Sequence, residues 1–131
     1  MTQEEKQLLL IDLCGRQPYG VKICVAESYT KYSYTANIIK IYVNKDYIQI
    51  RPKDLHIQTA VYIEDIKPYL RSMSSMTFKE TREFLSIKNG EGKEYLLTTD
   101  KQNWLNEHHF DYRGLIEKGL ALEAPEDMYN S

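Results

Sequence analysis

Cysteine is scarce in this chain. It has two, Cys14 and Cys24, and neither belongs to a Cys-x-x-Cys pair or has a histidine close to it in the sequence. Zinc sites and redox pairs depend on such spacings, so the sequence argues against both. We expect the two thiols to be reduced and unpaired, and to pack as small apolar side chains.

Long apolar runs are absent as well. No segment approaches the roughly 20 apolar residues that a membrane span requires. Residues 2–5 are polar and partly acidic, whereas a secretory signal begins with basic residues and continues with a longer apolar run. The sequence therefore predicts a cytoplasmic protein with no membrane partner.

The motifs of common catalytic sites are also missing. The chain has no Gly-x-Ser-x-Gly nucleophile elbow, and no Gly-x-Gly-x-x-Gly or Gly-x-x-x-x-Gly-Lys phosphate loop. We predict that the protein is not an enzyme, that it has no catalytic residue, and that it needs no cofactor.

Tyrosine is the residue type that the chain has in excess, with 11 tyrosines against three phenylalanines and one tryptophan. Seven of them lie in residues 19–62, among isoleucines and valines. Aromatic and β-branched residues suit a pleated surface, so this stretch predicts a sheet. The alternation of apolar residues indicates strands at 21–27, 36–43 and 47–50, which short connections would join as an antiparallel meander.

Helix signals flank the predicted sheet. Thr2 and Glu5 match a capping box, which predicts a helix over residues 3–14 with Gly15 as its C-cap. Further helices are expected at 77–87, where Thr77 and Glu80 match a second capping box, from Thr99 onward, and at 111–120, where Asp111 would cap the N-terminus. Residues 63–70 are predicted as one or two helical turns, residues 94–98 and 120–124 as short strands, and residues 125–131 as a mobile tail.

A length of 131 residues suits one domain over residues 1–131. The predicted fold class is α+β: an N-terminal helix, an antiparallel sheet of three to five strands, and C-terminal helices packed on one face.

Two segments carry a resemblance. Residues 67–77 (KPYLRSMSSMT) and 104–125 (WLNEHHFDYRGLIEKGLALEAP) resemble a group of small proteins found in gut Bacteroides genomes and in their prophages. The resemblance implies a cytoplasmic protein borne by a mobile element. No function is known for the group, so the resemblance implies no activity and no site residues.

The cluster His108, His109 and Asp111 is the one group of potential metal ligands in the sequence, with His56 as a distant addition. Adjacent residues of a helix point about 100° apart, so the two histidines would not share a metal. We predict no metal site, with one ring beside Trp104 and the other in water.

Nucleic-acid binding is the alternative function. The segment 20–60 has six basic and three acidic residues, and aromatic rings with lysines can bind single strands. The candidate contacts are Tyr29, Tyr32, Tyr34, Lys40, Tyr42 and Lys45. A winged-helix-like order in the C-terminal half also fits, but residues 100–131 hold three basic against seven acidic residues. The overall net charge of -2 disfavours a dedicated polyanion binder.

The sequence favours a non-enzymatic protein-interaction module, because the basic sheet region and the acidic C-terminal third would suit contact with a protein partner or with a second copy. The candidate interaction surface is Trp104, His109, Tyr112 and Arg113. That surface is the alternative for the segment 104–122, which we expect first to be structural, with Trp104 buried against Leu105, Phe110, Leu115 and Ile116. Trp104→Ala should then cost roughly 3–5 kcal/mol of stability.

Overall fold

Helix α1 (Gln3–Arg16) begins at the predicted capping box. The computed structural model describes residues 1–26, 32–42, 44–53, 55–87 and 99–129. In it the Thr2 hydroxyl accepts from the Glu5 amide, and the Glu5 carboxylate accepts from the Thr2 amide. The sequence predicts Gly15 as the C-cap, but Gly15 lies inside α1. The chain leaves the helix through the 3₁₀ turn η1 (Gln17–Tyr19) and reverses at Gly20, whose φ of 73° suits glycine.

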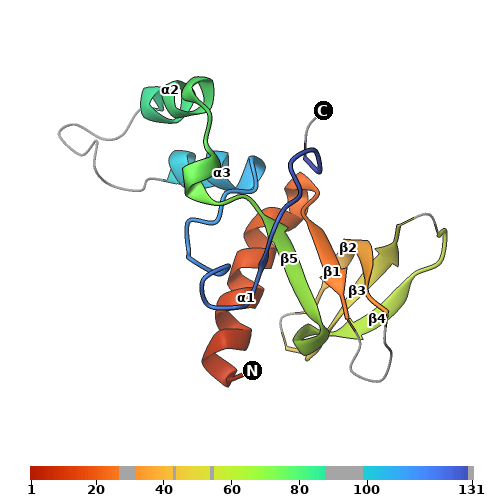
Figure 1. The fold of residues 1–131 in the computed structure, drawn as a ribbon. Helices are drawn as coiled ribbons and strands as arrows, with labels where there is room; N and C mark the ends of the chain where they lie inside the picture. The colour runs from red at the N-terminus through yellow and green to blue at the C-terminus, as the bar shows by residue number, and fades with distance from the viewer. Residues whose placement is uncertain (27–31, 43, 54, 88–98, 130–131) are drawn as a thin grey trace.

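The described strands form one mixed sheet in the order β4-β3-β2-β1-β5-β6 (Figure 1). They are β1 (Lys22–Val25), β2 (Tyr34–Ile41), β3 (Tyr47–Pro52), β4 (Thr59–Tyr62), β5 (Ile66–Leu70) and β6 (Leu122–Glu123). Strands β1 to β5 pair antiparallel, whereas β6 pairs parallel with β5. The α+β class is confirmed, but the prediction of an antiparallel sheet of three to five strands is wrong. A parallel neighbour is possible because the chain returns from β5 to β6 through a long connection that includes two helices.

Strand β5 replaces the helical turns predicted for residues 63–70. Only the 3₁₀ turn η2 (Ile63–Asp65) is helical. In β5 the side chains of Ile66, Pro68 and Leu70 are buried and that of Lys67 is exposed, which is the two-residue period of a strand. Pairing with β1 decides this conformation.

Strand β2 contains a bulge. Ile38 lies opposite Ile50 of β3, but the next pair is Lys40 with Gln49, so Ile39 is an extra residue. The bulge shifts the alternation by one residue. Lys40 therefore faces the same side as Asn37, and Ile41 packs with Ile38 against the core.

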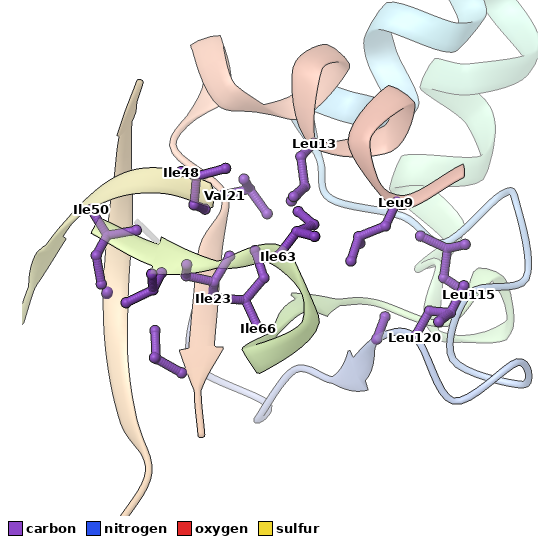
Figure 2. Packing of buried hydrophobic residues seen from close by; sticks show 14 of the residues in the cluster. Leu9, Leu13, Val21, Ile23, Ile48, Ile50, Ile63, Ile66, Leu115 and Leu120 are labelled. Atoms are coloured by element: carbon purple, nitrogen blue, oxygen red, sulfur yellow. The ribbon is translucent and has the colours of Figure 1, made fainter. Parts of the chain in front are cut away.

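The core lies between α1 and the inner face of the curved sheet (Figure 2). Leu9 and Leu13 of α1 meet buried strand residues such as Ile23 and Ile48, and Leu115 closes one side. The other buried apolar members are Val21, Val25, Ala36, Ile50, Val61, Ile63, Ile66, Leu70, Leu120 and Ala121.

The sequence predicts that the C-terminal helices pack on one face of the sheet, and this is wrong. They stack outward from α1 instead (Figure 1). Helix α3 (Thr99–Glu107) packs on α1, where the Asn106 amide lies 3.0 Å from the position of a Cβ on Gly15. After the turn η3 (Met73–Ser75), α2 (Phe78–Ser86) begins at the predicted capping box of Thr77 and contacts α3 through Phe84. The predicted strand at 94–98 lies outside the described residues.

No helix forms at residues 111–120, where the sequence predicts the last one. The Asp111 carboxylate does accept from the amides of Leu115 and Ile116 (2.8 and 3.0 Å), but the chain makes consecutive turns. Gly114 and Gly119 have φ values of 72° and 76°, which a right-handed helix does not allow. The strand predicted at 120–124 forms as β6.

Both cysteines are unpaired, as predicted, but Cys14 is exposed on α1 and Cys24 is half-buried, so neither is a core residue. At 14 residues α1 is the longest helix in the described part of the chain, and a membrane crossing needs about 20, so none of these helices qualifies as membrane-spanning.

Candidate functional site

The outward face of the sheet carries positive charge. Strands β1 to β5 contain four charged residues, Lys22, Lys40, Arg51 and Lys67, and all four are basic. Each stands at an outward position: Arg51 and Lys67 lie between buried neighbours, Lys22 precedes the buried Ile23, and Lys40 follows the bulge on the same side as Asn37. Lys53 follows β3 directly and donates its amide to Thr35 of β2. We call this surface the outward sheet face.

Cross-strand pairing arranges these side chains in rows. Lys22, Asn37 and Arg51 form one row across β1, β2 and β3. A neighbouring row pairs Cys24 with Lys67 on one side and with Thr35 on the other. The basic rows therefore lie at the end of the face where β2 begins.

Tyrosines lie at the other end of the outward sheet face. The rings of Tyr42 and Tyr47 are 5.3 Å apart, and the Lys40 ammonium lies 5.0 Å from the Tyr42 ring centroid. Tyr62 of β4 pairs with Tyr47 and is 64% exposed. Its ring is available to a planar ligand.

Two hollows open on this face. One, of about 180 Å³, is lined by Tyr47, Ala60, Val61 and Tyr62 at the aromatic end. The other, of about 320 Å³, lies at the basic end, where Lys22, Thr35, Asn37 and Lys53 face Pro125, Asp127 and Met128. The face thus combines rings at one end with a polar, lysine-lined hollow at the other.

The structure brings some of the predicted nucleic-acid contacts together. Lys40 and Tyr42 share the outward sheet face, and Lys45 is exposed in the turn between β2 and β3. Tyr32 is 83% exposed before β2. Tyr34, in contrast, packs against the core on the inner face, opposite Val25, and so does not share the outward sheet face. Tyr29 lies outside the described residues.

Several residues of the face were not selected from the sequence. They are Lys22, Tyr47, Arg51, Lys53, Tyr62 and Lys67. The signal that could have found them is the absence of any acidic residue from the strand segments, combined with the two-residue period. Pairing was needed to join segments that are far apart in the sequence.

The predicted interaction surface of Trp104, His109, Tyr112 and Arg113 does not form an open patch. The half-buried Trp104 ring stacks on His108 and Phe110, with centroids 4.0 and 5.8 Å apart. His109 is 6% exposed. These side chains make their contacts inside the junction between α1, α3 and the turns that follow α3.

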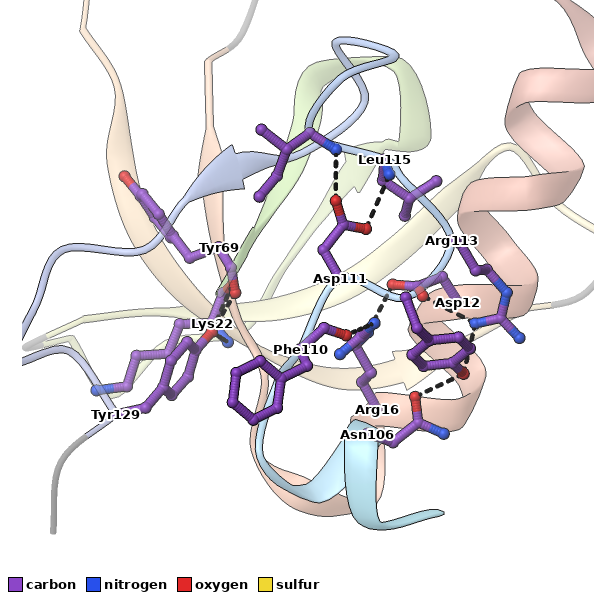
Figure 3. A network of polar contacts seen from close by, with 12 residues as sticks. Asp12, Arg16, Lys22, Tyr69, Asn106, Phe110, Asp111, Arg113, Leu115 and Tyr129 are labelled. Atoms are coloured by element: carbon purple, nitrogen blue, oxygen red, sulfur yellow. Dashed lines mark hydrogen bonds and ion pairs between the residues drawn. The ribbon is translucent and has the colours of Figure 1, made fainter. Parts of the chain in front are cut away.

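A buried polar network holds that junction (Figure 3). The Asp12 carboxylate accepts from Arg16 Nε at 2.8 Å and from Arg113 Nη1 at 2.9 Å. The four-residue spacing of Arg113 and Glu117 would suit an ion pair on a helix, but Arg113 binds Asp12. Asp12 and Arg16 are fully buried. Arg16 also donates to the Phe110 carbonyl at 2.6 Å, and Arg113 to the Tyr112 hydroxyl, which donates to Asn106.

The three residues of the possible metal cluster point to different partners. His108 Nδ1 donates to the Trp104 carbonyl at 2.9 Å, His109 is stacked on Tyr129, and both Asp111 oxygens accept backbone amides. Within the described residues, no group of three or more potential ligands could hold a metal ion.

His109 ends α3 in an unusual backbone conformation. Its amide donates to Asn106 and the Phe110 amide donates to Leu105, the two bonds of a Schellman motif. The left-handed position of this motif usually holds glycine, and here His109 has φ 62°. Burial, with the charges of Arg16, His108, Arg71 and Lys22, lowers the pKa of His109 to about 4. The ring is therefore neutral near pH 7.

Acidification should destabilise the protein through His109. Between its folded pKa of about 4 and the ordinary value of 6.5, the unfolded chain binds a proton that the folded chain does not. This stabilisation is complete above pH 6.5 and is lost toward pH 4. From about pH 7.5 to about pH 5 we expect a loss on the order of 1–2 kcal/mol, measured by urea denaturation. His109→Asn, which tolerates the backbone, should lose less; an equal loss in both proteins would contradict this assignment.

Comparisons of the chain with protein-family models, with curated proteins and with solved structures give no match. A functional argument therefore depends on the residues of this chain.

Proposed function

We propose that the protein binds single-stranded nucleic acid across the outward sheet face. The observation that carries the proposal is that every charged side chain of strands β1 to β5 is basic and stands at an outward position. Phosphates along a strand of nucleic acid would meet this positive surface, and the release of their counterions would drive binding.

The tyrosine end supplies the second requirement. Aromatic side chains bind single strands by stacking on unpaired bases, and paired bases inside a duplex are not available for this. The exposed ring of Tyr62 and the hollow that it shares with Tyr47 are suited to a base. From Tyr34 to Ile41, β2 extends about 23 Å at the usual rise per residue, which gives room for a few nucleotides.

The acidic net charge does not oppose this proposal. The formal net charge of -2 is an average over the chain, whereas phosphates respond to charges within about 8–10 Å at physiological salt. Seven of the acidic residues lie in residues 100–131, and of these Asp127 lines the hollow at the basic end, whereas strands β1 to β5 contain no acidic residue. The protein would thus present a basic face on an acidic chain.

The test is fluorescence anisotropy with a labelled oligothymidylate of about 12 nucleotides, a length within the range that small sheet domains bind. The variant Arg51→Gln with Lys53→Gln should bind about tenfold more weakly, and the salt slope should fall by about 1.4 for two lost phosphate contacts. Tyr62→Ala should cost about 1–3 kcal/mol of binding free energy through lost stacking.

The matched control is Lys79→Gln with Arg82→Gln on α2, which removes the same charges from exposed positions away from the sheet. This control should bind as the unchanged protein does. Equal weakening by both pairs of substitutions would contradict the proposed face. A poly-glutamate peptide that competes as well as the oligonucleotide would instead indicate an acidic protein partner, as in the interaction module that the sequence favours.

A further inference from the structure

The C-terminal residues 125–129, which we call the strap, lie across the basic end of the outward sheet face. The Tyr129 hydroxyl accepts from the Lys22 amide at 2.9 Å and donates to the Tyr69 carbonyl at 2.7 Å, so it bridges β1 and β5 (Figure 3). Its ring stacks on His109 at 3.8 Å. The sequence predicts a mobile tail here, but Tyr129 fixes this segment to the fold.

The strap brings a carboxylate to the lysines. Asp127 lines the 320 Å³ hollow opposite Lys22 and Lys53, while Thr35 and Asn37 of β2 add polar groups. Glu126, the preceding residue, lines a different hollow of about 270 Å³ with Arg71, Ser72 and other residues. Pro125 lines both hollows, so the strap forms the ridge between them.

We propose that the strap is autoinhibitory: Asp127 occupies the place of a nucleic-acid phosphate at Lys22 and Lys53, and a bound strand must displace it. This inference rests on the proposed function and adds a regulation to the same face. A carboxylate and a phosphate oxygen are alternative acceptors for a lysine ammonium. The internal carboxylate is always present at high local concentration, because Tyr129 anchors the strap two residues away.

The position of the carboxylate, not the number of negative charges, determines the inhibition. Asp127 and Glu126 are both exposed neighbours on the strap, and each contributes one negative charge. At 0.15 M salt the Debye length is about 8 Å, so a charge acts mainly on the groups that it directly faces. Asp127 lines the same hollow as Lys22 and Lys53, whereas Glu126 lines the other one.

The experiment compares Asp127→Asn with Glu126→Gln in the full chain, with the same labelled oligothymidylate. Asp127→Asn should bind about three- to tenfold more tightly than the unchanged protein at 0.15 M salt, and its salt slope should steepen by about 0.7, the value for one more neutralised phosphate. Glu126→Gln should change the affinity less than about twofold, because Glu126 lines the other hollow.

The outcomes separate this inference from the function on which it depends. Oligonucleotide binding by the unchanged protein, with equal affinities for the two variants, would overturn the autoinhibitory strap and leave the proposed function intact. No binding by any of the three proteins would contradict the proposed function and the strap together. Thermal denaturation of each variant shows whether the fold is retained. Because neither substitution removes the hydrogen bonds of Tyr129, we expect the melting temperature to stay unchanged.

Discussion

Asp12→Ala is expected to destabilise the protein by about 3–5 kcal/mol, the largest effect that we predict for a single substitution. Asp12 is fully buried and accepts from two arginines, Arg16 at 2.8 Å and Arg113 at 2.9 Å. Its removal leaves the fully buried Arg16 guanidinium without a counter-charge. Single domains are stable by roughly 5–15 kcal/mol, so the substitution would remove a large share of the free energy of unfolding, and urea denaturation would measure the change.

The control for this substitution is Glu64→Ala, which breaks an ion pair on the surface. Glu64 pairs with Lys6 at 2.6 Å, but its side chain is more than half exposed. Water screens such a pair, so we expect little change in the free energy of unfolding. Similar losses for the two variants would contradict a special role for the buried network.

Trp104→Ala is expected to cost about 2–4 kcal/mol, less than for a fully buried tryptophan because the ring is half-buried. The ring lies 5.5 Å from that of Phe84, one of the contacts between α2 and α3. The substitution should therefore loosen α2 as well as lower the melting temperature, and faster hydrogen exchange of the α2 amides would detect this. His108→Ala removes one stacking partner and should cost less.

An unchanged melting temperature in Trp104→Ala would mean that the ring is not part of the packing. The sequence already identifies Trp104 as a structural residue and predicts that its ring contacts Leu105, Phe110, Leu115 and Ile116. The ring contacts in the structure are with Phe84, His108 and Phe110, so of the predicted partners Phe110 is found. The expected loss of stability is therefore tied to α2, which the sequence does not connect to Trp104.

Local signals predicted the helices well. The capping boxes at Thr2 and Thr77 form as expected, because both partners of each bond lie within four residues. The same locality explains why Asp111 was correctly assigned as an acceptor of nearby amides. The helix itself was wrongly predicted after Asp111, since its apolar spacing fits a helix while Gly114 and Gly119 adopt left-handed conformations.

The outward sheet face was predictable only in part. Lys40 and Tyr42 are neighbours in the sequence and remain neighbours on the face. The side of the sheet that they face depends on the bulge at Ile39. No residue type in that segment indicates that the inward and outward alternation shifts there. Lys67 lies on the face because β5 pairs with β1. The sequence predicts helical turns for residues 63–70, and this prediction leaves no strand there that could pair with β1.

The sequence by itself determined the α+β class, the capped helices, the strands that start near residues 22, 34 and 47, and the positive charge of the sheet region. These features depend on periodicity, composition and contacts within one turn. Only the tertiary structure decided the parallel edge strand, the pairing of Asp12 with Arg113 and the docking of Tyr129 on Lys22. The two contacts join residues about 100 positions apart, and the free energy of such contacts comes from burial that no local pattern encodes.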